Sequence, residues 1–590
     1  MTTTRIDRRR LMQAAALAAL AGGGPAARAG QPATPTTVLD SGTQGQTRGA
    51  GGELRLLQWQ APTSLSLHTA SGTKDHLAAS IVSEPLMSYL PDGSLLPRLV
   101  TEVPSVENGL LASTFDEVTY HLLPDVTWSD GEPFTAADVV FTYDWLMDPG
   151  NAATSVGQYT AIREIAAVDA HTVRIRFAQP RAGWYVPFTG TNWGVVYPKH
   201  ILDGGGQDAL GAFSQRPVGT GPYVVDEFAP GDHVIYVPNE RYREPEKPFF
   251  ARVYLKGGGD AVSAARAVLQ TGDFDLAWNL QVEPRILDEL AGAGKGRVEV
   301  APGANLERLQ LNFSDPHTEV DGQRAHLGTP HPFFTDRRVR QAFALSIDKQ
   351  LIADELFLAG EAPAANFLVG IPAFDSPNTT WAYDPKRANQ LLDEAGWGWG
   401  DGHRIKDGVQ LKVTYAAPVN QVRQKTQAII KAAWEDIGVR VELAQVDPGI
   451  FFDGSAGNDQ NMSHFYYDVE MWSSGSDIPY PLTYMQGWYS GDDNVPQASN
   501  GWTGLNQQRY VNPEYDALWE DAAAETDPDR LAELFIAMND LVVEDLAGIP
   551  LIQRAAQVYG IANRLNGQNI VPSSFEQLYW NIANWNLAQG

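Results

Sequence analysis

Cysteine is absent from all 590 residues of this chain. That absence excludes disulfide bonds, thiol catalysis, thiolate metal sites and a lipid anchor on an N-terminal cysteine. Basic residues are also scarce, because 43 Lys and Arg stand against 71 Asp and Glu, for a formal net charge of −28. Proteins that bind nucleic acid carry a basic face, so no nucleic-acid partner is expected.

Long apolar runs are missing as well. The apolar stretch at residues 11–20 is about half of the roughly 20 residues that a membrane span needs. It follows three arginines, Arg8 to Arg10, and precedes an Ala-Arg-Ala sequence at 27–29. This order is typical of an export signal cleaved after Ala29, and the adjacent arginines favour the twin-arginine route over the general secretory one. We expect a soluble periplasmic protein without a lipid anchor.

The usual catalytic and metal motifs are lacking too. The chain has no G-x-S-x-G and no H-E-x-x-H sequence, and the glycine-rich stretch 292–296 lacks the spacing of a phosphate loop. His317, His326 and His331 lie close together in the sequence, but they share no helical face and their segment indicates a loop. We therefore expect neither a cofactor nor a metal, and no enzymatic activity.

What the chain does have is a mixture of helix and strand patterns along most of its length. A chain of 590 residues is too long for a single core, so two or three domains are expected. Residues 30–52 are rich in Gly, Pro and Thr and predict a flexible leader. Order begins with the alternating pattern at 53–57, and the whole indicates an α/β protein.

Several elements are predicted from local signals. The sequence Thr-Ala-Ala-Asp at 135–138 is a capping box that begins a helix, and Asp-Pro pairs at 384 and 527 begin two more. One long helix is expected from Thr335 past Ile352 to about Gly360. Residues 411–443 predict a strand–helix–strand unit with a glycine stop at Gly438.

Aromatic residues are concentrated between Phe465 and Tyr510, among Gly, Ser, Asn and Pro and without a helical stripe. Aromatic side chains in loops offer rigid contact area at little entropic cost. We expect part of this stretch to line a solute site, with core packing as the alternative.

Six segments, taken in chain order, resemble the family 5 extracellular solute-binding proteins, the group of oligopeptide- and dipeptide-binding proteins. The resemblance covers about residue 51 to the C-terminus. The segments are GGELRL at 51–56 with APTSL at 61–65, EPL at 84–86 with PDGSLLPRL at 91–99, WSDGEPFTAADVV at 128–140, PVGTGPY at 217–223, DRRVRQAF at 336–343, and YDP at 383–385 through GW at 396–397.

The resemblance implies a two-lobed, type II periplasmic-binding-protein fold with an extra domain inserted in the first lobe. Lobe I would comprise residues 53–80, 191–300 and 548–590, with the extra subdomain at 81–190, and lobe II would comprise 301–547. The implied function is capture of a peptide or peptide-like solute between the lobes. The monomeric protein would then deliver the solute to an ABC permease in the inner membrane.

Alternatives remain open at this point. The same fold could bind an opine, an oligosaccharide or a metal chelate, and a secreted hydrolase or a chaperone-like surface protein is a more distant reading. The carboxylate of Asp477 is the leading site candidate. In peptide-binding relatives, an Asp that follows a Trp and precedes a Pro by four residues supplies the carboxylate that pairs with the peptide's α-amino group. Asp477 and Pro481 keep that spacing. The other candidates are Trp472, Trp59, Tyr467 and Tyr480; a turn-forming role for Asp477 is the alternative.

Overall fold

The computed structural model describes residues 39–588, apart from residues 71, 152, 281, 359, 453–456, 492 and 493. The predicted signal sequence at 1–29 lies outside the described residues. Within the described part, no helix is both long enough and apolar enough to cross a membrane.

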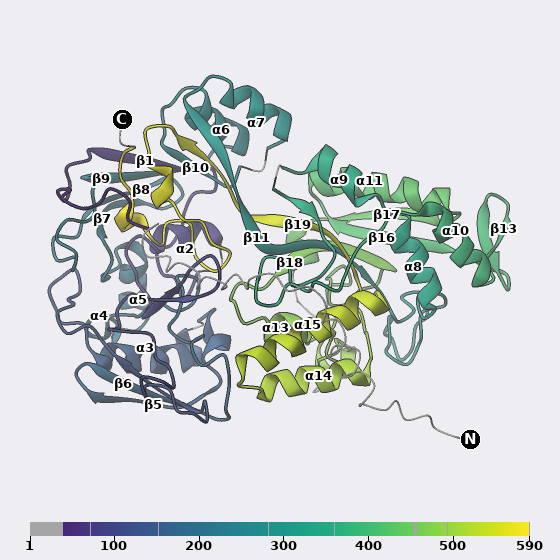
Figure 1. Cartoon of the computed structure of the whole chain (residues 1–590), viewed down its shortest axis with the longest axis horizontal. Coiled ribbons are helices and arrows are strands. Elements are labelled where there is room, and N and C mark those ends of the chain that lie inside the picture. The colour runs from purple at the N-terminus through teal and green to yellow at the C-terminus, as the bar shows by residue number, and fades with distance from the viewer. Residues whose placement is uncertain are drawn as a thin grey trace, which may run out of the picture. The chain divides into compact units, whose positions relative to one another are not determined.

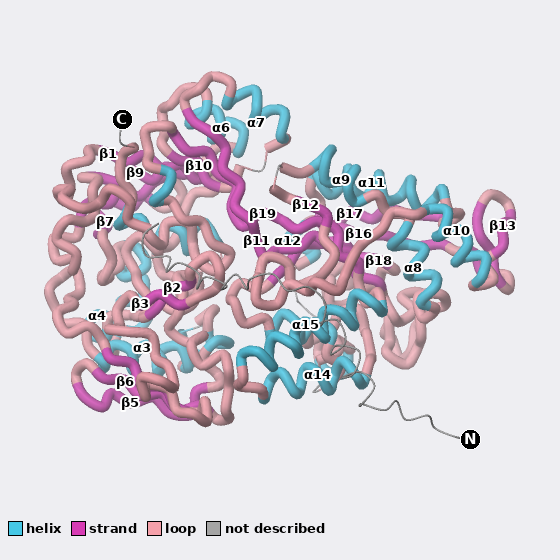
Figure 2. The backbone as a smooth tube through the Cα atoms, viewed as in Figure 1, coloured by secondary structure: helices cyan, strands magenta, loops and turns pink. Residues whose placement is uncertain are grey.

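An 11-stranded sheet forms the frame of the protein (Figures 1 and 2). Its strands follow the order β17-β16-β18-β11-β19-β10-β1-β9-β8-β7, and β12 pairs with β19 at the side. The bounds are β1 (Glu53–Gln58), β7 (Tyr223–Ala229), β8 (His233–Pro238), β9 (Arg252–Gly257), β10 (Leu276–Trp278), β11 (Gly296–Leu311), β12 (Ala362–Pro363), β16 (Lys412–Pro418), β17 (Arg440–Val446), β18 (Val469–Gly475) and β19 (Ile549–Ala562).

Two long strands, β11 and β19, connect the two halves of this sheet (Figure 1). Residues 296–301 of β11 pair with 557–562 of β19, which in turn pairs with β10. Residues 305–311 of β11 pair with β18 on one side, and residues 306–309 also pair with β19 on the other. Three register shifts fall between residues 301 and 308 of β11, and such irregularities bend a sheet locally. The two-lobed fold predicted from the sequence is therefore built on two continuous strands.

The remaining elements cover this frame or form smaller sheets. The short strands are β2 (Met87–Tyr89), β3 (Leu95–Pro97), β4 (Glu117–His121), β5 (Ile162–Asp169), β6 (Thr172–Phe177), β13 (Gly398–Gly400), β14 (His403–Lys406) and β15 (Val409–Gln410). The helices are α2 (Thr73–Ala79), α3 (Ala136–Met147), α4 (Lys199–Leu202), α5 (Gly206–Gln215), α6 (Ala261–Leu269), α7 (Pro284–Ala291), α8 (Arg337–Leu345), α9 (Lys349–Leu356), α10 (Pro385–Glu394), α11 (Gln421–Asp436), α12 (Pro448–Phe451), α13 (Leu482–Met485), α14 (Pro513–Ala524) and α15 (Pro528–Asp545).

The predicted strand–helix–strand unit is confirmed. Strands β16 and β17 pair in parallel, and α11 connects them. The side chain of Asn420 caps α11 by accepting from the backbone N–H groups of Val422 and Arg423. Gly438 ends the unit's helix at a φ of 89°, a left-handed conformation that favours glycine. The cap brings residues 420–423 to the carboxyl end of β16, where parallel sheets bind ligands.

The extra subdomain is organised around the sheet β4-β6-β5 and helix α3. The predicted capping box is present, since Thr135 and Asp138 bond each other's backbone at the start of α3. Trp128 and Phe134 are buried in the same core, which also includes residues 195–213. The exact boundaries of 81–190 stay a prediction.

Two predictions from the sequence are wrong. The single helix expected from Thr335 is broken into α8 and α9, because Asp348 starts a new helix by accepting from the N–H of Leu351. Asp336, and not Thr335, caps α8. The leader is also not flexible over residues 39–52. Arg48 donates to four backbone carbonyls between residues 240 and 247, and Leu39 is buried.

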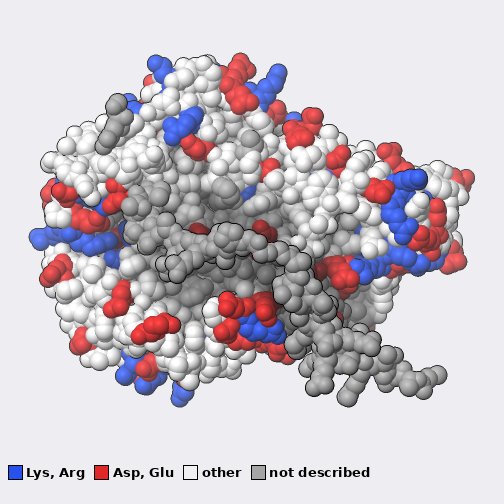
Figure 3. Space-filling model, viewed as in Figure 1, with Lys and Arg blue, Asp and Glu red and all other residues white. Residues whose placement is uncertain are grey.

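The surface carries both signs of charge. Figure 3 shows acidic and basic side chains interspersed over one face of the protein. Many form exposed ion pairs, such as Arg387 with Glu394 at 2.6 Å and Lys425 with Glu283 at 3.0 Å. Exposed pairs of this kind contribute only about 0–1 kcal/mol each. The buried apolar clusters, not the surface charges, therefore stabilise the fold.

Candidate functional site

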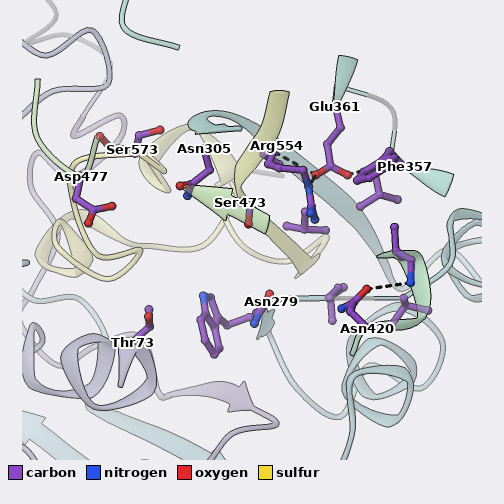
Figure 4. Close-up of a pocket in the computed structure, with 18 of the residues that line it drawn as sticks. Thr73, Asn279, Asn305, Phe357, Glu361, Asn420, Ser473, Asp477, Arg554 and Ser573 are labelled. Atoms are coloured by element: carbon purple, nitrogen blue, oxygen red, sulfur yellow. Dashed lines mark hydrogen bonds and ion pairs between the residues drawn. The ribbon is translucent and has the colours of Figure 1, made fainter. Parts of the chain in front are cut away.

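A cavity of about 670 Å³ lies against the region where β11 and β19 pass from one half of the sheet to the other (Figure 4). One wall comes from α2, the β10–α7 connection and residues 573–577. The other comes from β11, the start of α11, the end of β18 and β19. Small-molecule sites have volumes of roughly 300–1,000 Å³. Asparagine, glutamine, serine and threonine side chains are frequent in the lining, so the site suits a polar solute.

Asp477 lines this cavity, directly after β18 ends at Gly475. A Cβ atom at Gly475 would collide with the carbonyl oxygen of Ala304, so only glycine fits this close approach. The turn that follows is held by Ser476, whose hydroxyl donates to the carbonyl of Ile478 at 2.6 Å. The turn therefore does not rely on a bond from the Asp477 carboxylate to its own backbone.

The Asp477 carboxylate has no hydrogen-bond or ion-pair partner among the described residues, and it is exposed to the cavity. The protein that surrounds the cavity removes much of its water, and this desolvation raises the pKa of Asp477 above its ordinary value. A cation placed next to the carboxylate would reverse this shift. Asp477 is thus an uncompensated acceptor that faces the space a ligand would fill.

The opposite end of the cavity holds a network of two arginines and two glutamates, of which Figure 4 labels Arg554 and Glu361. Arg423 contacts Glu307 at 2.7 Å and the hydroxyl of Ser473 at 3.1 Å. Arg554 contacts Glu361 at 2.6 Å and Glu307 at 3.4 Å. Burial alone would lower the pKa of Arg554, but the two carboxylates outweigh burial and raise it. Carboxylates inside the protein thus compensate the charges of both arginines.

The wall formed by α2 and by residues 192–193 and 573–577 supplies aromatic and polar groups. His76 bonds the carbonyl of Ala70 at 3.0 Å and meets the ring of Trp193 edge-on at 5.4 Å. Burial lowers the pKa of His76, so the imidazole is neutral at pH 7. Glu576 accepts from the backbone of Tyr89 and Thr191, both at 2.7 Å, and burial raises its pKa. These bonds hold the 573–577 segment at the cavity wall.

Of the five residues predicted from the sequence, Asp477 lines the cavity, and the other four pack next to it or farther away. Trp472 lies against the guanidinium of Arg308, with 4.5 Å between the guanidinium carbon and the ring centroid. Trp59 donates to the carbonyl of Asn279, a lining residue, at 2.8 Å. Tyr467 packs on the small cluster around Phe451.

Tyr480 and most of the neighbouring aromatic residues belong to a core of their own. The ring of Tyr480 meets that of Phe535 at 6.0 Å, and Trp488, Tyr489 and Tyr510 are buried in the same cluster. Trp488, Tyr489 and Tyr510 thus pack in a core, as the alternative in the sequence analysis expects. These aromatic residues show no helical periodicity in the sequence because short helices and loops, not one long helix, carry them into the core. The ligand-binding roles of Trp472, Trp59, Tyr467 and Tyr480 stay predictions.

Sequence reasoning missed Arg423, Arg554, Asn305 and the two tryptophans Trp193 and Trp278, all of which line the cavity. A signal for Arg423 was present, because it follows the carboxyl end of a predicted parallel strand. The others come from segments far apart in the chain. Nothing in their local sequence distinguishes them from ordinary core or surface residues.

Two histidines of the predicted histidine segment contact the buried carboxylate of Asp468, away from this cavity. His317 and His331 both contact Asp468, at 3.1 Å and 3.0 Å, whereas His326 bonds the N–H of Gly328. Burial alone would raise the pKa of Asp468, but the two histidines lower it to about 2. No group of three or more metal-ligating side chains with suitable geometry occurs in the part of the chain that the structure describes.

The profile of the bacterial extracellular solute-binding proteins, family 5 (middle region) matches residues 111–495. The probable D,D-dipeptide-binding periplasmic protein DdpA of Escherichia coli is 25% identical over 451 residues, which are 75% of this chain and 77% of DdpA.

Solved structures agree on the fold. The ABC transporter substrate-binding protein CtaP of Listeria monocytogenes superposes with a TM-score of 0.73 at 21% identity, covering 92% of this chain and 100% of CtaP. The binding protein AgaA of A. tumefacien R10, solved with agropinic acid, gives 0.67 at 20% identity, covering 91% of this chain and 99% of AgaA. With the family profile matching more than half of its length, the chain belongs to the bacterial extracellular solute-binding proteins of family 5.

Proposed function

We propose that this protein captures a small polar solute that carries a protonated amine, with a short peptide as the leading class, and delivers it to an ABC permease. The observation that carries the proposal is the unpaired carboxylate of Asp477 facing the cavity. The names of DdpA and CtaP support a peptide solute and an ABC transporter.

The charges of the lining favour a cation. Arg423 and Arg554 are compensated by Glu307 and Glu361, Glu283 is paired with Lys425, and Glu576 accepts from the backbone N–H groups of Tyr89 and Thr191. Among the described lining residues, Asp477 is then the carboxylate that neither a cation nor a hydrogen-bond donor of the protein contacts. An ammonium group next to it would gain a charge-assisted hydrogen bond in surroundings of low dielectric constant.

Lobe closure would complete the site. The shifts of register in β11 between residues 301 and 308 separate the parts that carry each lobe, so we place the hinge there. A solute can drive closure only through its extra affinity for the closed form. A solute that contacts Asp477 on one side and residues 573–577 on the other would have that extra affinity.

A non-peptide solute is the second candidate, because AgaA was solved with an opine. A hydrolase is disfavoured by the cavity itself. Its histidine, His76, is neutral and already bonded to a backbone carbonyl, and no carboxylate among the described residues is hydrogen-bonded to it to orient it as a general base.

The first test is direct identification of the solute. Native mass spectrometry of protein purified without denaturation should show a bound species of small mass with a basic nitrogen, and titration calorimetry should give a Kd near micromolar, about −8 kcal/mol. Small-angle scattering should show a smaller radius of gyration when the solute is added. An unchanged radius at saturation would contradict closure, and turnover of the solute would contradict the binding role.

The second test concerns export. We propose that residues 1–29 direct the chain to the periplasm by the twin-arginine route, so the mature chain should begin at Gly30. N-terminal sequencing of periplasmic protein checks the cleavage site. The double substitution Arg8→Lys with Arg9→Lys should block export, and unaffected export would rule out the twin-arginine route.

A further inference from the structure

A second cavity, of about 680 Å³, lies within lobe II and apart from the residues of the first. It is enclosed by α8, α10, the C-terminal part of α15, the start of β19 and the loop at 378–382. Its volume is in the range of roughly 300–1,000 Å³ that small-molecule sites have. None of the proposed roles of the first cavity requires this space.

Lys349, at the start of α9, lines this cavity although only 4% of its surface is exposed. Its ammonium group donates to the carbonyl of Ala364 at 3.0 Å and lies 5.8 Å from the ring centroid of Trp381. An ammonium has three donors, and no carboxylate lies within ion-pair distance of it among the described residues. A buried charge without a partner is costly, so a bound anion would stabilise the ammonium of Lys349.

The other charged groups of the lining are ion-paired or hydrogen-bonded within the protein. Arg337 on α8 pairs with Glu544 on α15 at 3.0 Å, and Arg387 on α10 pairs with Glu394 at 2.6 Å. Asp540 on α15 accepts from the side chain of Asn378 at 2.8 Å. Among the described residues of this lining, Lys349 is therefore the cation that no carboxylate of the protein contacts.

A further polar group also lacks a partner. The hydroxyl of Thr379 is buried in the loop at 378–382 and makes no hydrogen bond to any described residue. Thr379 lines the same cavity as Lys349. Buried polar groups are normally satisfied, and an unsatisfied one costs about 1–3 kcal/mol. A hydroxyl can donate to an anion, so an anionic ligand would satisfy both Thr379 and Lys349.

Part of the wall is apolar. It is formed by aliphatic and aromatic side chains from four elements and the loop, namely Ala344, Leu345, Trp381, Leu391, Val543, Ile549 and Pro550. Such a surface gains free energy when it covers an apolar body and excludes water from it. The cavity thus combines one uncompensated cation with an apolar wall.

We propose that this cavity is a second small-molecule site, which takes a carboxylate or similar monoanion carried on an apolar body. The anion would contact the ammonium of Lys349 and the hydroxyl of Thr379, and the apolar body would lie against Trp381 and the aliphatic wall. Burial lowers the pKa of Lys349 to about 7, so binding should weaken as the pH rises through 7 and the ammonium loses its proton.

The experiment uses 4-phenylbutyrate as the probe and its neutral amide, 4-phenylbutyramide, as the matched control. Calorimetry on the full mature protein at pH 6 should detect the carboxylate at millimolar concentration or below, and the amide at least 10-fold more weakly. Lys349→Met should reduce carboxylate affinity at least 10-fold. Lys386→Met, an exposed lysine on α10 outside the lining, should leave it unchanged.

Two further arms keep the test decisive. Ala344→Phe should fill the cavity and abolish binding even if Lys349→Met does not fold. Asp477→Asn should leave probe binding unchanged, which separates this site from the one between the lobes. The proposal would be overturned if the acid and the amide bound equally, or if Lys349→Met bound the acid as tightly as the wild type. It would also be overturned if the wild type did not bind 4-phenylbutyrate at about 10 mM, roughly tenfold above a millimolar Kd.

Discussion

Replacing Asp477 with asparagine should weaken binding of an amine-bearing solute by about 30-fold or more, because removing one member of a desolvated charge pair costs roughly 2–5 kcal/mol. Asparagine keeps the shape of the side chain but cannot compensate an ammonium. Calorimetry on wild type and variant with the same solute measures the change. A matched substitution at the exposed Asp436, at the end of α11, should have no effect.

Although Asp477→Asn should weaken binding, it should not lower the stability of the protein without solute. Because folding raises the pKa of Asp477, its ionised form destabilises the folded state at any pH above the unfolded pKa. The asparagine variant without solute should therefore be at least as stable as the wild type at pH 7. A variant that binds as tightly as the wild type, or one whose melting temperature falls without solute, would show that Asp477 has a different role.

Replacing Glu84 with glutamine should lower the free energy of unfolding by about 3–5 kcal/mol, because it leaves two buried arginines without a counterion. Only 3% of the Glu84 side chain is exposed, and it contacts Arg98 at 2.8 Å and Arg243 at 2.6 Å. It also accepts from the hydroxyl of Thr220 at 3.1 Å. Urea denaturation at pH 7 measures the loss.

Glu53 provides the control for this prediction. It also contacts two arginines, Arg55 and Arg252, but all three side chains are open to solvent. Glu53→Gln should therefore cost about 1 kcal/mol or less. If the two substitutions cost the same, burial is not what makes the Glu84 cluster important.

The pH dependence of the Glu84 effect follows from its pKa. Burial alone would raise this pKa, but Arg243 and Arg98 lower it below the ordinary 4.5. A depressed carboxyl pKa contributes stability that is present above the unfolded pKa and lost as the pH falls through the folded one. The difference between wild type and Glu84→Gln should thus be constant from pH 5 to 7 and shrink below about pH 4.5.

Much of the fold could be predicted from local sequence. The capping box at Thr135, the Asp-Pro helix starts at 384 and 527 and the strand–helix–strand unit all appear where their patterns indicate. The break between α8 and α9 was missed, since their apolar stripe is continuous and only the cap at Asp348 interrupts the helix.

The amino-acid sequence by itself determined the helix caps, the strand alternation, the absence of cysteine chemistry and the resemblance from which Asp477 was predicted to bind the solute. Each depends on residues close together in the chain or on a motif. Tertiary structure alone decided that Asp477 is unpaired, that Arg423 and Arg554 are compensated by Glu307, and that Lys349 is buried without a carboxylate. Charge compensation depends on distances between residues that are remote in sequence, and the long strands β11 and β19 set those distances when they connect the two lobes.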